Sequence, residues 1–221
     1  MGKHSSRFKI ALLISLLLLV ALVFLFFLNR LLQHQPDASR ITLQKILAKN
    51  EELLTHTLAD LDGDGDKELV LKIKAQDSVF IKIYAGERKR WLSKWKSPSL
   101  GYEDKKIFIE DGKTGLEVLD INRDGEKEII TSALHTSMHT NLYIYRWDKT
   151  RGEAVLLESL VSDVGWTVGE DIVVHLDGVI KVVGREYNLE GVPRVAEYQY
   201  IWDGEKYAYE GFRTLGPLWP E

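Results

Sequence analysis

The feature that most constrains the fold is an acidic segment that occurs twice. Residues 58–70 read LADLDGDGDKELV, and residues 118–130, which begin 60 positions later, read VLDINRDGEKEII. In both copies apolar residues flank a short run rich in acidic residues and Gly. A repeat of this length is typical of proteins that stack similar β units side by side. The chain is therefore expected to contain related β units, two of which carry an acidic loop.

Each acidic segment follows the pattern D-x-[DN]-x-D-G-x-x-E, which favours calcium binding. Calcium takes about six to eight oxygen ligands at roughly 2.3–2.6 Å, and alternating acidic residues on a tight loop supply them. Asn122 removes one charge, so the second loop is expected to bind more weakly. The predicted ligands of the first loop are Asp60, Asp62 and Asp64, the backbone carbonyl of Asp66, and Glu68. Those of the second loop are Asp120, Asn122, Asp124, Glu126 and Glu128.

An EF-hand and a plain polar turn are the two alternatives to such a site. An EF-hand requires a Glu at loop position 12, whereas Leu71 and Thr131 stand there. The segments could also be polar turns between strands, since turns favour Asp, Asn and Gly. However, unit charges 4 Å apart repel by about 4 kcal/mol at an effective dielectric of about 20. A bound divalent ion explains why such repulsion is tolerated and repeated.

The remainder of the domain reads as all-β. Apolar and β-branched runs at residues 69–74, 79–84, 107–109, 116–118, 142–147, 172–176, 179–183 and 198–202 predict short strands. The pair Asp177-Gly178 predicts a hairpin turn. Before these strands, residues 41–54 have the spacing of a short amphipathic helix. The predicted fold is about three propeller-blade-like antiparallel sheets, preceded by one transmembrane helix and this short helix.

The acidic loops and the strands around them resemble the FG-GAP/VCBS-type repeats of integrin-α-like β-propellers. The matching residues are 60–70 and 120–130, with blade-like strands at 81–84, 142–145 and 200–204. The resemblance implies calcium held in loops within each blade. The FG and GAP tripeptides are absent, and a third unit at about 160–212 has no acidic loop. About three units fit here, so an open stack or a compact three-blade domain is expected.

An apolar run of 19 residues, 10–28, broken only by Ser15, is long enough to cross a bilayer. A cleaved signal peptide is the alternative, but no small-residue cleavage pattern follows. Lys3, Arg7 and Lys9 precede the run, which places the N-terminus in the cytoplasm. The predicted organisation is a cytoplasmic tail (1–9), a signal-anchor (10–29) in the lipid bilayer, a spacer with a short helix (30–54) and an extracytoplasmic β-rich repeat domain (55–221). The protein is expected in the cell membrane as a single-pass form.

Composition narrows the functional classes. The formal net charge is −4, which argues against nucleic acid as a partner. Cysteine is absent, so disulfides and thiolate sites are excluded. The leading hypothesis is a non-enzymatic calcium-binding module that recognises a protein or glycan in the cell envelope. The alternatives are a metal-dependent envelope hydrolase that uses His135 and His139, and a structural subunit of a membrane complex.

Overall fold

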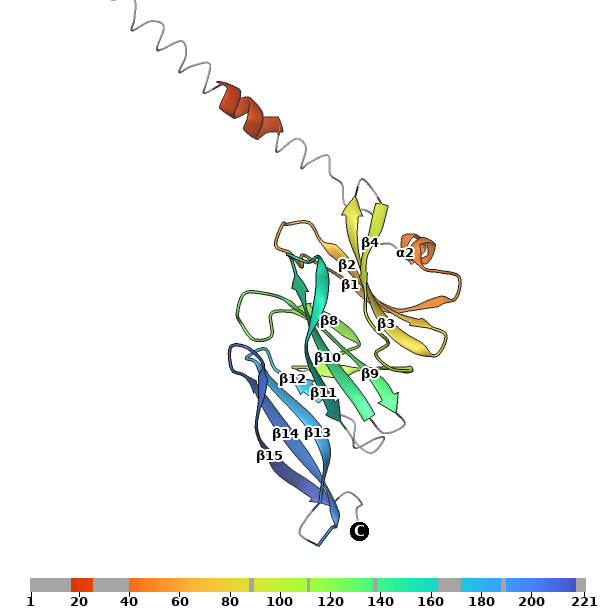
Figure 1. The fold of residues 1–221 in the computed structure, drawn as a ribbon, viewed down its shortest axis with the longest axis vertical. Helices are drawn as coiled ribbons and strands as arrows, with labels where there is room; N and C mark the ends of the chain where they lie inside the picture. The colour runs from red at the N-terminus through yellow and green to blue at the C-terminus, as the bar shows by residue number, and fades with distance from the viewer. Residues whose placement is uncertain are drawn as a thin grey trace, which may run out of the picture.

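The protein is built mainly of β-strands in three sheets, as the sequence predicts (Figure 1). The computed structural model describes residues 17–25, 40–87, 90–110, 112–136, 139–162, 172–187 and 190–217. The sheets follow one another in space in the order in which most of their strands occur in the chain. The second sheet packs one face on the first sheet and the other face on the third, and this arrangement positions the acidic loops.

The first sheet has four antiparallel strands in chain order and is covered by a helix. Its elements are α2 (Arg40–Ile46), β1 (Glu51–Ala59), β2 (Glu68–Ala75), β3 (Ser78–Glu87) and β4 (Arg90–Lys96). Leu43 of α2 is 1% exposed and packs with Leu69, Leu71 and Trp91 of the sheet. The helix therefore contributes to the core beneath this sheet.

The predicted helix over residues 41–54 is too long. Helix α2 ends at Ile46, and β1 begins at Glu51, four residues before the predicted start of the β domain at residue 55. Pairing with β2 explains the difference, because Glu51 lies opposite Ala75 and Leu53 opposite Ile73. Cross-strand hydrogen bonds and packing outweigh the weak helical spacing of Leu53 and Leu54.

The second sheet repeats the arrangement of the first. It contains β5 (Glu103–Lys105), β8 (Leu116–Leu119), β9 (Glu128–Thr136), β10 (His139–Asp148) and β11 (Glu153–Ser162). The strand pairs β1–β2 and β8–β9 each enclose one acidic loop. In matching registers Leu69 pairs with Tyr84, and Ile129 pairs with Tyr145. The sequence repeat is thus a structural repeat.

The third sheet joins strands from two distant parts of the chain. Its members are β6 (Ile107–Ile109), β7 (Gly112–Thr114), β12 (Ile172–Val174), β13 (Val179–Tyr187), β14 (Pro193–Trp202) and β15 (Tyr207–Pro217). The hairpin predicted at Asp177-Gly178 is confirmed, with Gly178 at φ +83° between β12 and β13. Strand β6 pairs in parallel with β12. An all-antiparallel arrangement is therefore wrong for this sheet.

A buried lysine joins the first two sheets. Lys72 of β2 is fully buried, and its Nζ lies 2.5 Å from Asp104 Oδ1. The same Nζ donates hydrogen bonds to the carbonyl oxygens of Lys105, Gly115 and Ser132. A buried ammonium is tolerated when it is paired and hydrogen-bonded in this way. This contact sets how the two repeat units meet.

The N-terminal region is described over only part of the predicted anchor. Residues 17–25 are helical, and their large apolar side chains are at least 49% exposed. The rest of the predicted span 10–29, the tail 1–9 and residues 30–39 of the spacer lie outside the described residues. Among the described helices, none has both the length and the apolar character required to cross a bilayer.

Candidate metal centre

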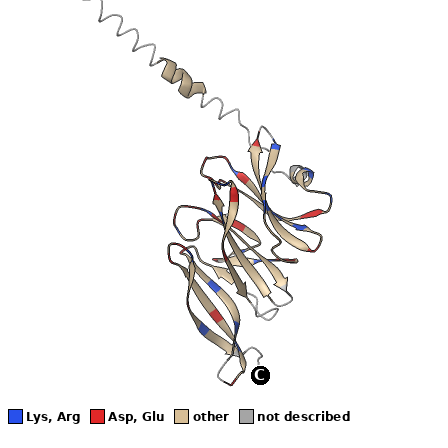
Figure 2. Cartoon of the chain, viewed as in Figure 1, with Lys and Arg blue, Asp and Glu red and all other residues tan. Residues whose placement is uncertain are grey.

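The two acidic loops, residues 60–68 (the first loop) and 120–128 (the second loop), each connect adjacent antiparallel strands and lie next to each other. Lys127 Nζ of the second loop is 3.5 Å from the carbonyl oxygen of Asp60. A hollow of about 140 Å³ between them is lined by residues of both loops and of β10. Acidic residues mark both loops in Figure 2. The turn at Gly178, in the third sheet, packs against Asn122 of the second loop.

The backbone of the first loop is held by its own acidic side chains. The Asp60 carboxylate accepts hydrogen bonds from the amides of Gly63 (2.6 Å) and Gly65 (3.1 Å). Asp62 and Asp64 each accept one from the amide two residues further along. Because these bonds span five residues or fewer, the local sequence alone can specify the loop.

The second loop repeats most of the bonds of this scaffold. Asp120 accepts from the amide of Gly125 at 3.0 Å, and Asn122 accepts from Asp124 at 3.1 Å. Asp124 in turn accepts from the amide of Glu126 at 2.9 Å. Asn122 therefore replaces Asp62 without loss of the turn, since an amide oxygen accepts a hydrogen bond as a carboxylate does.

Backbone angles confirm that the loops are equivalent. Gly65 and Gly125 have φ values of +91° and +89°. Gly63 has φ +77°, and Arg123, at the matching position, has φ +59°. A side chain at positive φ is unfavourable for most residues. The second loop thus keeps this conformation although an arginine has replaced the glycine.

The last acidic residue of each loop points inward. Glu68 is 6% exposed, and its Oε2 accepts a hydrogen bond from the Leu61 amide at 2.8 Å. Glu128 is fully buried and accepts one from Ile121 at 3.1 Å. Both glutamates thus close their loops from the core side, where a carboxylate without a cation is costly.

Three of the five predicted ligands in the first loop converge. Asp60, Asp62 and Glu68 each offer an oxygen, and these oxygens lie within 4.8 Å of one another. That spacing suits a hard cation bound by oxygen ligands. Asp64 and Asp66 belong to the same loop but are not members of this group. Among the described residues, no ion pair to Asp60, Asp62 or Glu68 occurs.

The charge of Glu68 is therefore poorly compensated. Burial raises the pKa of Glu68 to about 7. The Leu61 hydrogen bond lowers this pKa, whereas the neighbouring charges of Asp62 and Asp64 raise it. Without a cation the carboxyl is partly protonated near neutral pH. A divalent ion at this place would favour the charged form.

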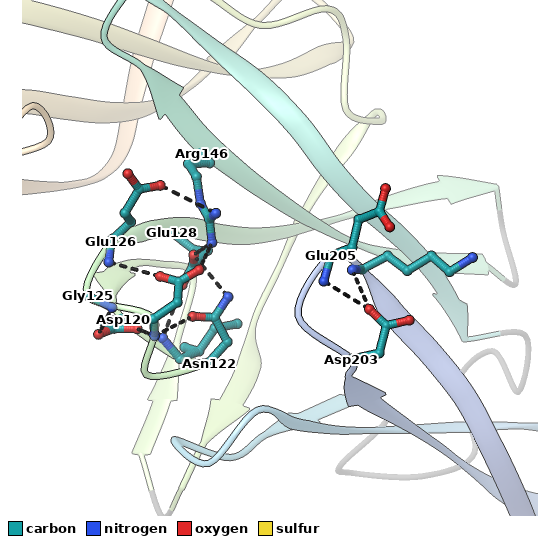
Figure 3. Close-up of polar contacts among 11 residues, drawn as sticks. Asp120, Asn122, Gly125, Glu126, Glu128, Arg146, Asp203 and Glu205 are labelled. Carbon is teal, nitrogen blue, oxygen red and sulfur yellow. Dashed lines mark hydrogen bonds and ion pairs between the residues drawn. The ribbon is translucent and has the colours of Figure 1, made fainter.

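The second loop has a cation of its own (Figure 3). The guanidinium of Arg146, on β10, lies 2.6 Å from Asp124 Oδ2 and 2.5 Å from Glu128 Oε1 through Nη2. Its Nη1 lies 3.3 Å from Glu126 Oε2. Burial raises the pKa of Glu128, and the hydrogen bond from Arg146 acts in the opposite direction. Three of the five predicted ligands in this loop therefore contact an arginine.

Sequence reasoning did not identify Arg146. It lies 18 residues beyond Glu128, its cross-strand partner, and belongs to a strand rich in aromatic residues. The pairing of β9 with β10 could have identified it. If Tyr145 pairs with Ile129, the next residue, Arg146, must lie opposite Glu128. The corresponding residue after Tyr84 is Ala85. The two units therefore differ at this facing position.

The histidines considered for a hydrolase lie elsewhere. His135 is exposed near the end of β9, and His139 is half-buried at the start of β10. Both belong to the end of the β9–β10 hairpin opposite to the second loop, because Glu128 begins β9. Within the described residues, neither belongs to a group of three metal-binding side chains.

No protein-family model matches the chain, and no curated protein matches it either.

Proposed function

We propose that the protein is a calcium-binding β-repeat module, tethered to a membrane, and that the first loop is its calcium site. The convergence of the Asp60, Asp62 and Glu68 oxygens within 4.8 Å supports this proposal. All the donors are oxygens, which suits calcium or magnesium better than softer metals. The backbone carbonyl of Asp66, side-chain oxygens of Asp64 and water would complete the shell.

Calcium in this loop would stiffen the connection between β1 and β2. Binding to the folded state alone adds its free energy to stability. The first sheet would then be held in one shape at extracytoplasmic calcium concentrations. This behaviour fits the resemblance to FG-GAP/VCBS-type propeller-blade repeats, in which such loops order the blade. A rigid β surface of this kind is suited to the recognition of a protein or glycan in the cell envelope.

The test is the melting temperature of the full chain in detergent, with calcium, with magnesium and with chelator. Calcium at about ten times Kd should add about 1.4 kcal/mol. For a chain of this size the melting temperature should rise by about 3–5 °C. Asp60→Asn should abolish the rise, whereas Asp120→Asn, the matched change in the second loop, should retain it. Equal melting curves with calcium and chelator would reject the proposal, and an equal response to magnesium would reject calcium preference.

Anchoring is a separate part of the proposal. It is supported by the apolar run of residues 10–28 and by the exposed apolar side chains of the helix at 17–25. The basic residues before the run favour a cytoplasmic N-terminus, with the β domain outside. The protein should remain in the membrane fraction after extraction at alkaline pH, and protease added outside the cell should reach the β domain. Release of the protein by alkaline extraction would contradict anchoring.

A further inference from the structure

We propose that Arg146 is the built-in cation of the second loop, and that this loop takes no metal while Arg146 is present. The residue that follows the tyrosine shared by the two units, on the neighbouring strand, then decides how each repeat unit is neutralised. Ala85 leaves the first loop open to a metal, and Arg146 closes the second. The first-loop half of this statement rests on the proposed function, whereas the second-loop half does not.

The contacts of Arg146 involve the carboxylates that a metal would need. Nη2 approaches both Asp124 Oδ2 and Glu128 Oε1, and Nη1 approaches Glu126 Oε2 (Figure 3). Glu128 Oε1 is also 3.5 Å from Asn122 Nδ2. Short charge-assisted hydrogen bonds of this kind are the strong ones, and the guanidinium remains charged at all relevant pH values. A divalent ion in the loop would have to displace it.

Packing on the third sheet keeps the guanidinium in place. The Arg146 guanidinium lies 5.6 Å from the ring centroid of Trp202, at the end of β14. Trp202 donates its backbone N–H to the Gly178 carbonyl oxygen at 3.0 Å. Arg123, also in the second loop, donates from Nε to the carbonyl oxygen of Leu176 at 2.8 Å. Protein contacts from two sheets thus order the second loop.

The first loop has the same scaffold but a different residue at the matching position of the neighbouring strand. Tyr84 and Tyr145 hold matching registers, opposite Leu69 and Ile129. The next residue is Ala85 in one unit, and in the other it is Arg146, whose pairing with Glu128 is part of the strand register. Alanine cannot reach the loop carboxylates. Only the first unit would therefore respond to calcium, while the second stays ordered without it.

The test uses the full chain in detergent, titrated with calcium chloride by calorimetry, in a background in which Asp60→Asn disables the first loop. This background should bind no calcium. Adding Arg146→Ala should restore binding of one ion, at the second loop. The control Arg146→Lys, which keeps the charge, should not restore it. The inference is overturned if the Asp60→Asn chain binds calcium and a further Asp120→Asn substitution removes that binding.

The reciprocal change tests the first loop. Ala85→Arg in the otherwise unchanged chain should weaken calcium binding by at least about tenfold and raise the melting temperature in chelator. If the chain binds no calcium at all, the proposed function fails, yet the Arg146→Ala arm still decides the second loop. If circular dichroism shows that the Arg146→Ala chain is not folded, the Ala85→Arg variant provides the deciding test of the inference. Failure of that variant to raise the melting temperature in chelator would overturn the inference.

Discussion

The first and second loops share a backbone and differ in the source of positive charge. Matching hydrogen bonds and matching φ values hold both loops in one shape. The second loop has Arg146 against its carboxylates, whereas the first has Ala85 at the same register position. The backbone conformation of an acidic loop is therefore not sufficient to show that the loop binds a metal. A residue on the neighbouring strand decides how the charge is balanced.

The largest effect should come from removing the built-in cation. Arg146→Ala in calcium-free buffer should lower the free energy of unfolding by about 3 kcal/mol, because it strands a buried carboxylate. The side chain of Glu128 is 0% exposed, and Arg146 lies 2.5 Å from it. Urea denaturation measures the change. Arg151→Ala, an arginine whose side chain is 68% exposed, should change stability by at most about 0.5 kcal/mol. Equal losses in the two variants would remove the distinction between the loops.

The pH dependence of stability should report the burial of the Glu68 carboxyl in the first loop. The folded-state pKa of Glu68 is raised from 4.5 to about 7. Its contribution to stability is thus fully present below pH 4.5 and is lost as the pH rises through about 7. In chelator, stability should fall by about 2–3 kcal/mol between pH 4.5 and pH 7.

Glu68→Gln should remove most of that fall, since Gln cannot ionise. The exposed Glu52→Gln should leave it in place. Urea denaturation of each variant at several pH values measures the slope. A slope that Glu68→Gln does not change would mean that another group carries it.

A smaller effect is expected from glycine substitutions, which test whether the backbones of the two loops have the same requirement for a positive φ. Gly65→Ala and Gly125→Ala place a side chain at φ near +90°. Each should lower the free energy of unfolding by about 1–2 kcal/mol in chelator. For Gly125 no heavy atom lies within 4 Å of the added Cβ, so the loss comes from the backbone alone. Thermal unfolding of both variants gives the comparison. A difference above about 1 kcal/mol would show that the loops are not equivalent.

The smallest effect concerns Arg123. Arg123→Gly removes the backbone strain of a side chain at φ +59°, but it also removes the hydrogen bond to the Leu176 carbonyl oxygen. These two effects oppose each other, so stability should change by at most about 0.5 kcal/mol. Thermal unfolding measures it. A clear loss would show that this contact with the third sheet matters more than the backbone angle.

The acidic loops could be predicted from the sequence because their hydrogen bonds are local. The acidic side chains of each loop bond to amides at most seven residues away. Their positions in the chain are sufficient to specify such turns. The β character of the domain is similarly local, since most of its strands contain apolar and β-branched runs. The hairpin at Asp177-Gly178 follows from the turn residues alone.

Other features depend on contacts between distant segments. The pairing of β6 with β12 joins residues more than 60 positions apart, and no local pattern specifies it. Strand β1 begins at Glu51 because β2 lies beside it. Arg146 reaches the second loop through the register of β9 with β10. Sequence alone therefore determined which residues form two acidic loops. Their different charge environments arise from strand register, because the position of a cation depends on which strand lies opposite.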